Sequence, residues 1–261
     1  MTPFQSALLG LLQGITEFLP VSSSGHLVLA QALLPGFEQP GVLFDVMLHF
    51  ATLAAVVVYF RRDVGRLVRA LAPGGEPAQR RIAGWIVAAT VPTGLIGVLF
   101  QDVLESLFHA PRAAAAMLLV TGVLLWLGET LGRPRHGLER FGLGRALAVG
   151  TVQGLAIVPG ISRSGSTIAA ACLMGVRPED AARFSFLLSI PAIVGAVVLQ
   201  LPHLGGVPAE ALPVYGLGMA AAFLSGVAAI GVLMGAVRNA RFRWFALYCW
   251  ALGIGYLLWG P

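Results

Sequence analysis

The chain has 261 residues, of which 57% are hydrophobic and 11% are charged, and its formal net charge is +5 at pH 7. Soluble domains carry about 25% charged residues, so the charged residues here are too few to cover a water-facing surface, and a soluble domain is excluded. The mean hydropathy of +0.83 therefore predicts an all-α integral membrane protein, with residues 1–261 forming a single membrane domain.

The first apolar stretch, residues 4–19, is predicted to be helical. Pro20 and the polar run 22–26 interrupt it before a second short apolar piece at 27–34. At about 1.5 Å per residue, neither half-helix crosses the ~30 Å of hydrocarbon. We therefore expect a re-entrant hairpin whose polar tip is buried in protein or in a water-filled cavity. No basic region precedes this stretch, so no removable signal peptide is expected.

Six further apolar segments meet the length of about 20 residues that a spanning helix needs, so six transmembrane helices are predicted. They are residues 43–60, 82–101, 113–129, 184–200, 214–236 and 244–260. Between the third and the fourth lies another broken stretch, 146–158 and 167–175, which is interrupted by Pro159, Gly160 and the polar residues 162–166. This stretch predicts a second re-entrant hairpin.

The two broken stretches are similar in sequence at a distance of 140 residues. Gln13-Gly14 matches Gln153-Gly154, Ser22 matches Ser162, and Ser24-Gly25 matches Ser164-Gly165. Each half, approximately 1–130 and 140–261, would then hold one hairpin followed by three spans. Because three is odd, the second half runs through the membrane inverted, which is the inverted-repeat arrangement of secondary transporters.

The arginines indicate how the chain is oriented. With six spans, one side of the membrane receives Arg61, Arg62, Arg66, Arg69, Arg80, Arg81, Arg133, Arg135, Arg140, Arg145, Arg177, Arg183, Arg238, Arg241 and Arg243. Arg112 alone lies on the other side. The positive-inside rule places the arginine-rich side in the cytoplasm and both termini outside. All 17 basic residues are arginine, and their position at the ends of apolar runs is typical of membrane topology, so no nucleic acid is expected as a partner.

Ionisable residues within membrane segments are functional candidates because burying them is unfavourable. Glu17, His26 and Arg163 meet this description. Glu17 follows Gln13 by four residues, so both side chains share one helical face. A purely structural role, in which Glu17 and Arg163 only neutralise each other, is less favoured, because apolar packing often replaces such a pair without loss of stability.

Both hairpin tips favour an anion. At each tip a half-helix begins among hydroxyl groups, and free backbone N–H groups and the helix dipole attract negative charge there. The residues concerned are Ser22, Ser23, Ser24 and Gly25 at the first tip and Ser162, Ser164 and Thr167 at the second. Arg163 adds a guanidinium suited to phosphate. Serine caps alone would explain each tip, but not the added arginine and histidine, so we predict a phosphate or pyrophosphate site.

His26 lies beside the hydroxyls of the first tip, where it could serve as general acid, base or nucleophile. His49, within the first span, is ambiguous. Asp45, at the start of that span, is either an interfacial residue or part of the entrance to the site.

Residues 13–26, QGITEFLPVSSSGH, closely resemble the first signature of the bacterial undecaprenyl-diphosphatase family linked to bacitracin resistance, (E/Q)xxxE followed by a serine-rich tip and His. Residues 159–167, PGISRSGST, resemble its second signature, PGxSRSxxT. The order of the motifs, the length and the span pattern also fit, so the resemblance covers essentially the whole chain.

The resemblance implies removal of the terminal phosphate of undecaprenyl diphosphate, giving the monophosphate carrier of cell-wall precursors, in the bacterial inner membrane. It implies a divalent cation, Mg²⁺ or Ca²⁺, held by Glu17, with Gln13 either binding the metal or only donating a hydrogen bond. It also implies that bacitracin competes indirectly by sequestering the substrate, and it allows a homodimer. The expected catalytic residues are Glu17, Ser23, His26 and Arg163.

The attacking atom is left open by the sequence. Ser23 with His26 as its base is the preferred arrangement, while attack by His26 or by a water activated by Glu17 are alternatives. The positive-inside rule makes the first hairpin enter the membrane from the outside, so the site is expected to be open to the periplasmic side.

A transporter or flippase of a phosphorylated polyprenyl lipid is a second hypothesis, because the inverted repeat is a transporter arrangement. Such a protein needs no nucleophile, so serine and histidine at one tip favour the enzyme. An ion channel is weakly supported, because no ring of like residues is visible.

Overall fold

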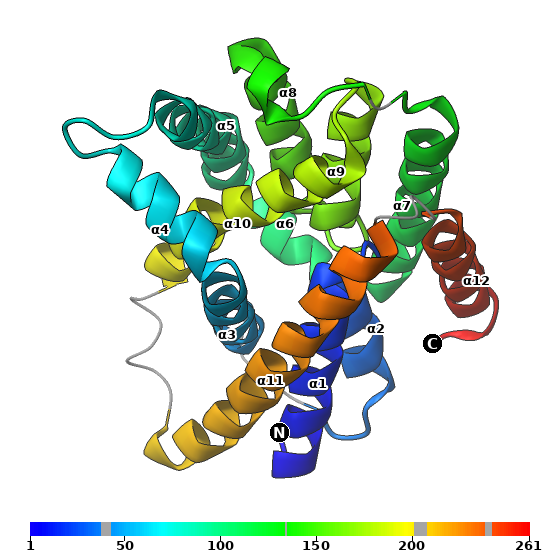
Figure 1. Ribbon diagram of the computed structural model, residues 1–261. Coiled ribbons are helices and arrows are strands. Elements are labelled where there is room, and N and C mark those ends of the chain that lie inside the picture. The colour runs from blue at the N-terminus through cyan, green and yellow to red at the C-terminus, as the bar shows by residue number, and fades with distance from the viewer. Residues whose placement is uncertain (38–42, 134, 201–207, 238–241) are drawn as a thin grey trace.

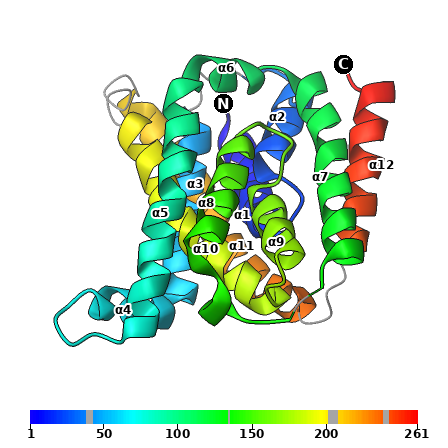
Figure 2. The same cartoon turned by 90° about the horizontal axis from the view of Figure 1, so that it is seen from above.

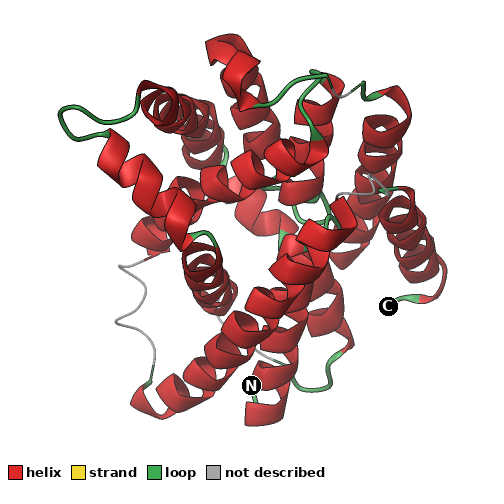
Figure 3. Ribbon diagram, in the orientation of Figure 1, coloured by secondary structure: helices red, strands yellow, loops and turns green. Residues whose placement is uncertain are grey.

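A computed structural model describes residues 1–37, 43–133, 135–200, 208–237 and 242–261. These residues form helices and loops, with one isolated bridge between His136 and Val176 (Figure 3). The all-α prediction is confirmed for this part of the chain.

The helices of the first half are α1 (Pro3–Phe18), α2 (Ser23–Leu33), α3 (Leu43–Tyr59), α4 (Arg61–Ala70), α5 (Pro77–Leu99), α6 (Gln101–Leu107) and α7 (Pro111–Leu131). The second half contains η1 (Leu138–Arg140), α8 (Gly142–Leu155), α9 (Arg163–Leu173), α10 (Pro178–Gln200), η3 (Ala209–Ala211), α11 (Leu212–Val237) and α12 (Arg243–Trp259). Both predicted breaks lie where expected, between α1 and α2 and between α8 and α9.

Several predicted boundaries need correction. The second half-helices begin at Ser23 and Arg163, so the polar tip residues form their first turns instead of a loop. The segment between the predicted spans 43–60 and 82–101 is not a simple connection, because it contains α4, which bends by 80° from α3. The span predicted from residue 184 begins at Pro178, because a proline is tolerated in the first turn of a helix and Glu179 and Asp180 favour its N-terminus.

Among the described residues, four helices are long and apolar enough to cross a membrane: α5, α7, α10 and the segment formed by η3 and α11 (Figure 1). The bent pair of α3 and α4 would be a fifth if it counts as one span. Helix α12 has 17 residues and is about 25 Å long. The chain is thus a multi-pass membrane protein.

The entry helix of each hairpin packs against a long helix of the other half of the chain. Helix α1 packs on α11, and α8 packs on α5. Glycines allow both approaches: a Cβ atom on Gly10 would lie 2.0 Å from the carbonyl oxygen of Gly218, and one on Gly150 would lie 2.0 Å from that of Ala89. Because no side chain fits at these distances, glycine is required at both positions.

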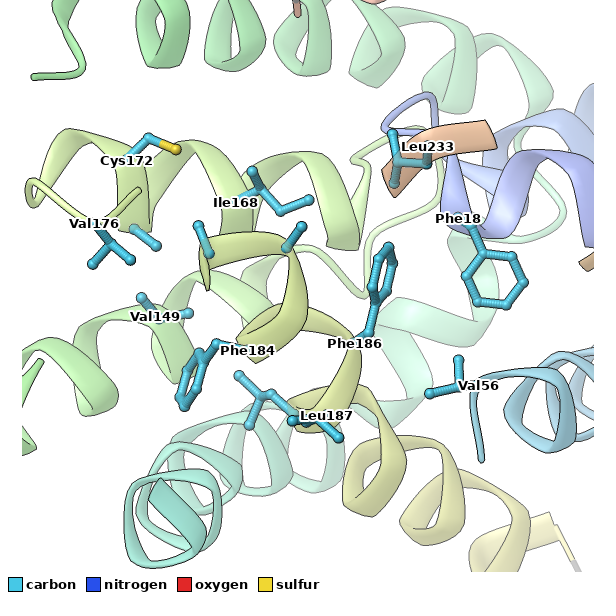
Figure 4. Packing of buried hydrophobic residues seen from close by; sticks show 14 of the residues in the cluster. Phe18, Val56, Val149, Ile168, Cys172, Val176, Phe184, Phe186, Leu187 and Leu233 are labelled. Atoms are coloured by element: carbon cyan, nitrogen blue, oxygen red, sulfur yellow. The ribbon is translucent and has the colours of Figure 1, made fainter. Parts of the chain in front are cut away.

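The largest apolar cluster joins the hairpins to the spans. Figure 4 shows side chains from α1, α3, α8, α9, α10 and α11 meeting around α10. Phe18, at the end of α1, packs edge-on against Phe186 with 5.7 Å between the ring centroids. This cluster fixes the end of α1, where the polar residues of the first tip begin.

The molecule has two clearly different ends in Figure 2. Both chain termini and α6 lie at one end, and α4 lies at the opposite end. Helix α4, which carries Arg61, Arg62, Arg66 and Arg69, therefore lies at the end of the molecule opposite α6.

We predict that Gly150→Ala lowers stability by about 1–3 kcal/mol, because the added methyl forces α8 away from α5. Gly144→Ala is the matched control on the same helix, since nothing lies within 4 Å of its Cβ position. Thermal unfolding of the purified variants in detergent provides the measurement. Equal melting temperatures for the two variants would contradict the close α5–α8 contact.

Candidate active site

The two hairpin tips meet inside the protein. The hydroxyl of Ser22 accepts a hydrogen bond from the backbone N–H of Gly160, at 3.1 Å, and another from that of Gly25, at 3.3 Å. A Cβ atom on Gly25 would lie 2.8 Å from the Cα of Gly160. Glycine at position 25 therefore lets the backbones of the two tips touch, while a Cβ atom on Gly160 would lie 2.1 Å from the carbonyl oxygen of Ala114 on α7.

Helix α7 supports the second tip through one threonine. The hydroxyl of Thr121 donates to the carbonyl of Gly160, at 2.7 Å, and accepts from the N–H of Ser162, at 2.8 Å. Gly160 has a φ of 94°, a conformation that glycine adopts without a steric penalty. The Pro159-Gly160 break thus turns the chain so that α9 starts beside the first tip.

Glu17 is the centre of the polar cluster between the tips. Its carboxylate accepts hydrogen bonds from Arg163 and from the hydroxyl of Ser23, and a third from the side-chain amide of Gln13, at 2.9 Å. The Nε2 atom of His49 lies 3.4 Å from the same carboxylate. Glu17 is 5% exposed, and these partners offset the unfavourable burial of its charge. Glu17 and Arg163 are thus in direct contact, the pairing that the sequence suggests only as part of the less favoured structural role.

Two polar atoms in this cluster have no partner among the described residues. They are Nη1 of Arg163 and Oε1 of Gln13, and both are buried. A buried donor or acceptor without a partner is destabilising by about 1–3 kcal/mol. The cluster therefore has an unused guanidinium N–H and an unused carbonyl oxygen, which match an anion and a cation or proton donor, respectively.

The cluster lies at one end of a cavity of about 470 Å³. Its polar wall near the tips includes Glu17, Ser22, Ser23, Ser24, Ser162, Arg163 and Ser164, together with Asp45, His49 and Gln153, and further polar lining comes from Thr90, Thr93, Gln101, Glu105 and Gln200. The remaining wall is mainly apolar and comes from α5, α6 and α10, including Val98, Leu104, Phe108, Ile193 and Leu199. A charged group at the tips and an apolar chain along α5 and α10 would both find suitable surroundings.

The serines of both tips line the cavity, but the hydroxyl of Thr167 and the backbone of Gly25, two other expected phosphate ligands, have different contacts. The hydroxyl of Thr167 is hydrogen-bonded to that of Ser185 on α10, at 2.6 Å, and also donates within α9. Gly25 lies at the point where the backbones of the two tips touch, because it has no side chain there. The phosphate-binding role of these two residues stays a prediction.

His26 does not contact Ser23 in the structure. Its Nδ1 atom lies 2.7 Å from the carbonyl oxygen of Ser22, and its Nε2 atom lies 2.8 Å from the hydroxyl of Tyr248 on α12. The predicted arrangement, in which His26 accepts the proton of Ser23, is therefore not formed. Ser23 is hydrogen-bonded to Glu17 instead.

His49 and Asp45 belong to the cavity wall, which the sequence left undecided. Asp45 is 2% exposed and accepts a hydrogen bond from the amide of Gln31, at 2.7 Å. His49 lies one helical turn later and contacts Glu17. The signal was present: two ionisable side chains four residues apart in an apolar segment share one helical face and favour a functional site.

The comparisons with known proteins cover nearly the whole chain. Residues 6–255 match the sequence profile of the family described as "Bacitracin resistance protein BacA". The chain is 51% identical over 259 residues to an undecaprenyl-diphosphatase of Syntrophotalea carbinolica, covering 97% of both chains. It is 46% identical to that of Desulfatibacillum aliphaticivorans, over 94% of both chains. It is 44% identical to that of Rubrobacter xylanophilus, over 95% of this chain and 94% of the relative.

We predict that Arg163→Leu lowers the melting temperature, because it leaves the carboxylate of Glu17 without its main counter-charge, a change of about 3–5 kcal/mol. The double variant Glu17→Leu with Arg163→Leu is expected to regain most of the loss, since apolar side chains replace a buried pair. Thermal unfolding in detergent checks both variants. A double variant less stable than Arg163→Leu alone would show that the pair is required for folding.

Proposed function

Because the chain belongs to the bacitracin resistance protein BacA family, we propose that it is an undecaprenyl-diphosphatase. It hydrolyses the terminal phosphate of undecaprenyl diphosphate and recycles undecaprenyl phosphate for peptidoglycan synthesis. The supporting observation is the contact of Arg163, Glu17 and Ser23 at the polar end of an otherwise apolar cavity. In this proposal bacitracin opposes the enzyme indirectly, by sequestering the lipid substrate.

We further propose an inverted repeat of residues 1–130 and 140–261, with α1–α2 and α8–α9 as re-entrant hairpins and α3, α5, α7, α10, α11 and α12 as spans. The paired packing of α1 on α11 and α8 on α5 supports this arrangement. The glycines that permit the two contacts, Gly10 and Gly150, stand 140 residues apart, the same distance that relates the two tips.

In the proposed orientation the arginine-rich end faces the cytoplasm of the inner membrane. The cavity extends from the tips to Gln101, Leu104 and Glu105 of α6 and to Phe108 directly after it, and α6 lies at the end of the molecule opposite α4 (Figure 2). The diphosphate would therefore enter from the periplasmic side, with the prenyl chain against the apolar wall.

Arg163 and the tip hydroxyls bind the diphosphate. The free Nη1 of Arg163 and its position beside the N-terminus of α9 favour a phosphate oxygen. In the transition state of phosphoryl transfer, negative charge spreads over the non-bridging oxygens, so a fixed guanidinium stabilises it. Apolar walls exclude water and strengthen this interaction.

Ser23 is the proposed nucleophile and Glu17 the acceptor of its proton. As the Ser23 oxygen bonds to the terminal phosphorus, the bond from phosphorus to the bridging oxygen breaks, and undecaprenyl phosphate leaves with that electron pair. Water then hydrolyses the phosphoserine and releases inorganic phosphate. The hydrogen bond from Ser23 to Glu17 already orients the hydroxyl for this transfer.

A divalent cation, Mg²⁺ or Ca²⁺, is proposed at Glu17 and Gln13. The buried carbonyl oxygen of Gln13 has no partner, and a carboxylate with an amide oxygen is a donor set that these hard cations accept. Since Mg²⁺ commonly binds few protein groups together with phosphate oxygens, two ligands suffice. The cation supplies positive charge to the diphosphate.

We predict that Glu17→Ala, Ser23→Ala, His26→Ala and Arg163→Ala each lower kcat by at least ~100-fold. Glu17, Ser23 and Arg163 supply the reacting or phosphate-binding groups, and His26→Ala removes the imidazole contact with the carbonyl of Ser22, the residue before Ser23. Release of inorganic phosphate from a long-chain polyprenyl diphosphate by the purified variants is the measurement. Arg112→Ala is the matched arginine control and should keep full activity. A variant of the four with wild-type kcat would remove its residue from the mechanism.

A second prediction concerns the cation. Chelator should abolish phosphate release, and Mg²⁺ or Ca²⁺ should restore it. Gln13→Leu should require a higher cation concentration for half-maximal binding, measured by calorimetry with a non-hydrolysable diphosphate present, because it removes one oxygen ligand. Full activity of the metal-free wild type would contradict the cation proposal.

A further inference from the structure

Both ring nitrogens of His26 are engaged away from the cavity. Nδ1 lies 2.7 Å from the carbonyl oxygen of Ser22, and Nε2 lies 2.8 Å from the hydroxyl of Tyr248. The two rings are nearly parallel, with an interplanar angle of 6° and 5.6 Å between centroids. His26 is 5% exposed, so these contacts are made in a water-poor environment, where each is stronger than at a surface.

The contacts determine which nitrogen carries the proton in the neutral ring. A carbonyl oxygen only accepts, so Nδ1 must donate to Ser22. Nε2 is then the acceptor, and the hydroxyl of Tyr248 donates to it. The pair of partners thus fixes both the orientation and the tautomer of the imidazole.

The Nδ1–H group of His26 donates to the carbonyl of Ser22. Among the described residues, Ser22 is the one non-glycine residue with a positive φ. Ser22 has a φ of 69°, a conformation that L-residues rarely adopt and that is held only by its surroundings. The same carbonyl also accepts the backbone N–H of His26, at 3.1 Å. The imidazole therefore adds a second hydrogen bond to the strained turn.

This turn positions both neighbouring functional groups. The Ser22 side chain joins the first tip to the second through Gly160, and the next residue, Ser23, donates to Glu17. A relaxed turn at Ser22 would rotate the peptide that precedes Ser23 and move its hydroxyl from the carboxylate.

We propose that His26 and Tyr248 are positioning residues that hold the Ser22 turn, and that His26 neither attacks phosphorus nor accepts the proton of Ser23. Tyr248 orients the imidazole, the imidazole holds the Ser22 carbonyl, and the turn aims Ser23 at Glu17. This inference rests on the proposed diphosphatase function and assigns proton acceptance to Glu17 alone.

A matched pair of substitutions at His26 separates positioning from proton transfer. The amide nitrogen of His26→Asn occupies nearly the place of Nδ1 and can donate to Ser22, but it has no basic nitrogen. His26→Leu has a similar shape and no donor. We expect His26→Asn to keep kcat within about tenfold of wild type and His26→Leu to lose at least ~100-fold, with KM little changed in both. Equal losses in the two variants would overturn the proposal.

Tyr248→Phe tests whether the Tyr248 hydroxyl orients the imidazole of His26. This test does not depend on the stability of the His26 variants. Loss of one hydrogen bond predicts a fall in kcat of about fivefold. In ¹⁵N spectra, the His26 signals should change from a single Nδ1–H tautomer to a mixture. The control is Tyr256→Phe on the same helix, because the Tyr256 hydroxyl has no partner among the described residues. Unchanged kcat and an unchanged His26 tautomer in Tyr248→Phe would refute the role of Tyr248.

The two readouts distinguish failure of this inference from failure of the proposed function. If the wild type releases no phosphate from a polyprenyl diphosphate, the function is wrong, although the ¹⁵N spectra still report whether Tyr248 fixes the tautomer. If the wild type is active and His26→Asn is as inactive as His26→Leu, the function stands and His26 is a base or nucleophile.

Discussion

The contact between Glu17 and Arg163 is the interaction around which the candidate active site is built. It joins a carboxylate at the end of α1 to a guanidinium at the start of α9, two elements that neither half of the chain brings together alone. Two opposite charges buried in apolar surroundings are stable only while they remain in contact. The glycine contacts at the tips, the support from Thr121 and the packing of Phe18 all serve to keep these ends in place.

The similarity of the two hairpins makes their differences informative. Gln13 and Gln153 occupy matching positions, and the carbonyl oxygens of both side chains have no partner among the described residues. Where the first hairpin has Glu17, however, the second has Ile157, and where the second has Arg163, the first has Ser23. The carboxylate, hydroxyl and guanidinium therefore meet only because the matching positions differ. The two hairpins provide two similar tips, and the residues that differ between them supply the carboxylate, the hydroxyl and the guanidinium.

Much of this site could be predicted from the sequence because local signals define it. Proline, glycine and serine at 20–26 and 159–166 mark the breaks, and an isolated charge in an apolar segment is a functional candidate, so Glu17 and Arg163 could both be singled out. Their direct contact could not be predicted, because it depends on how the two hairpins pack. The contacts of His26 could not be predicted, since its partner Tyr248 lies 222 residues away and only the packing of the folded chain brings them together. The bend between α3 and α4 was missed for a similar reason: a charged helix and a loop have similar compositions.

The proposed function requires that the terminal phosphate binds between the tips, on the guanidinium of Arg163. Rotational-echo solid-state NMR between ³¹P of a bound methylene-diphosphonate analogue and ¹⁵N of arginine measures this contact directly. For wild-type protein we expect a phosphorus-to-nitrogen distance of about 4 Å, as a direct hydrogen bond requires, and loss of that signal in Arg163→Lys. The same dipolar coupling in Arg163→Lys, or no coupling in wild-type protein saturated with the analogue, would contradict it.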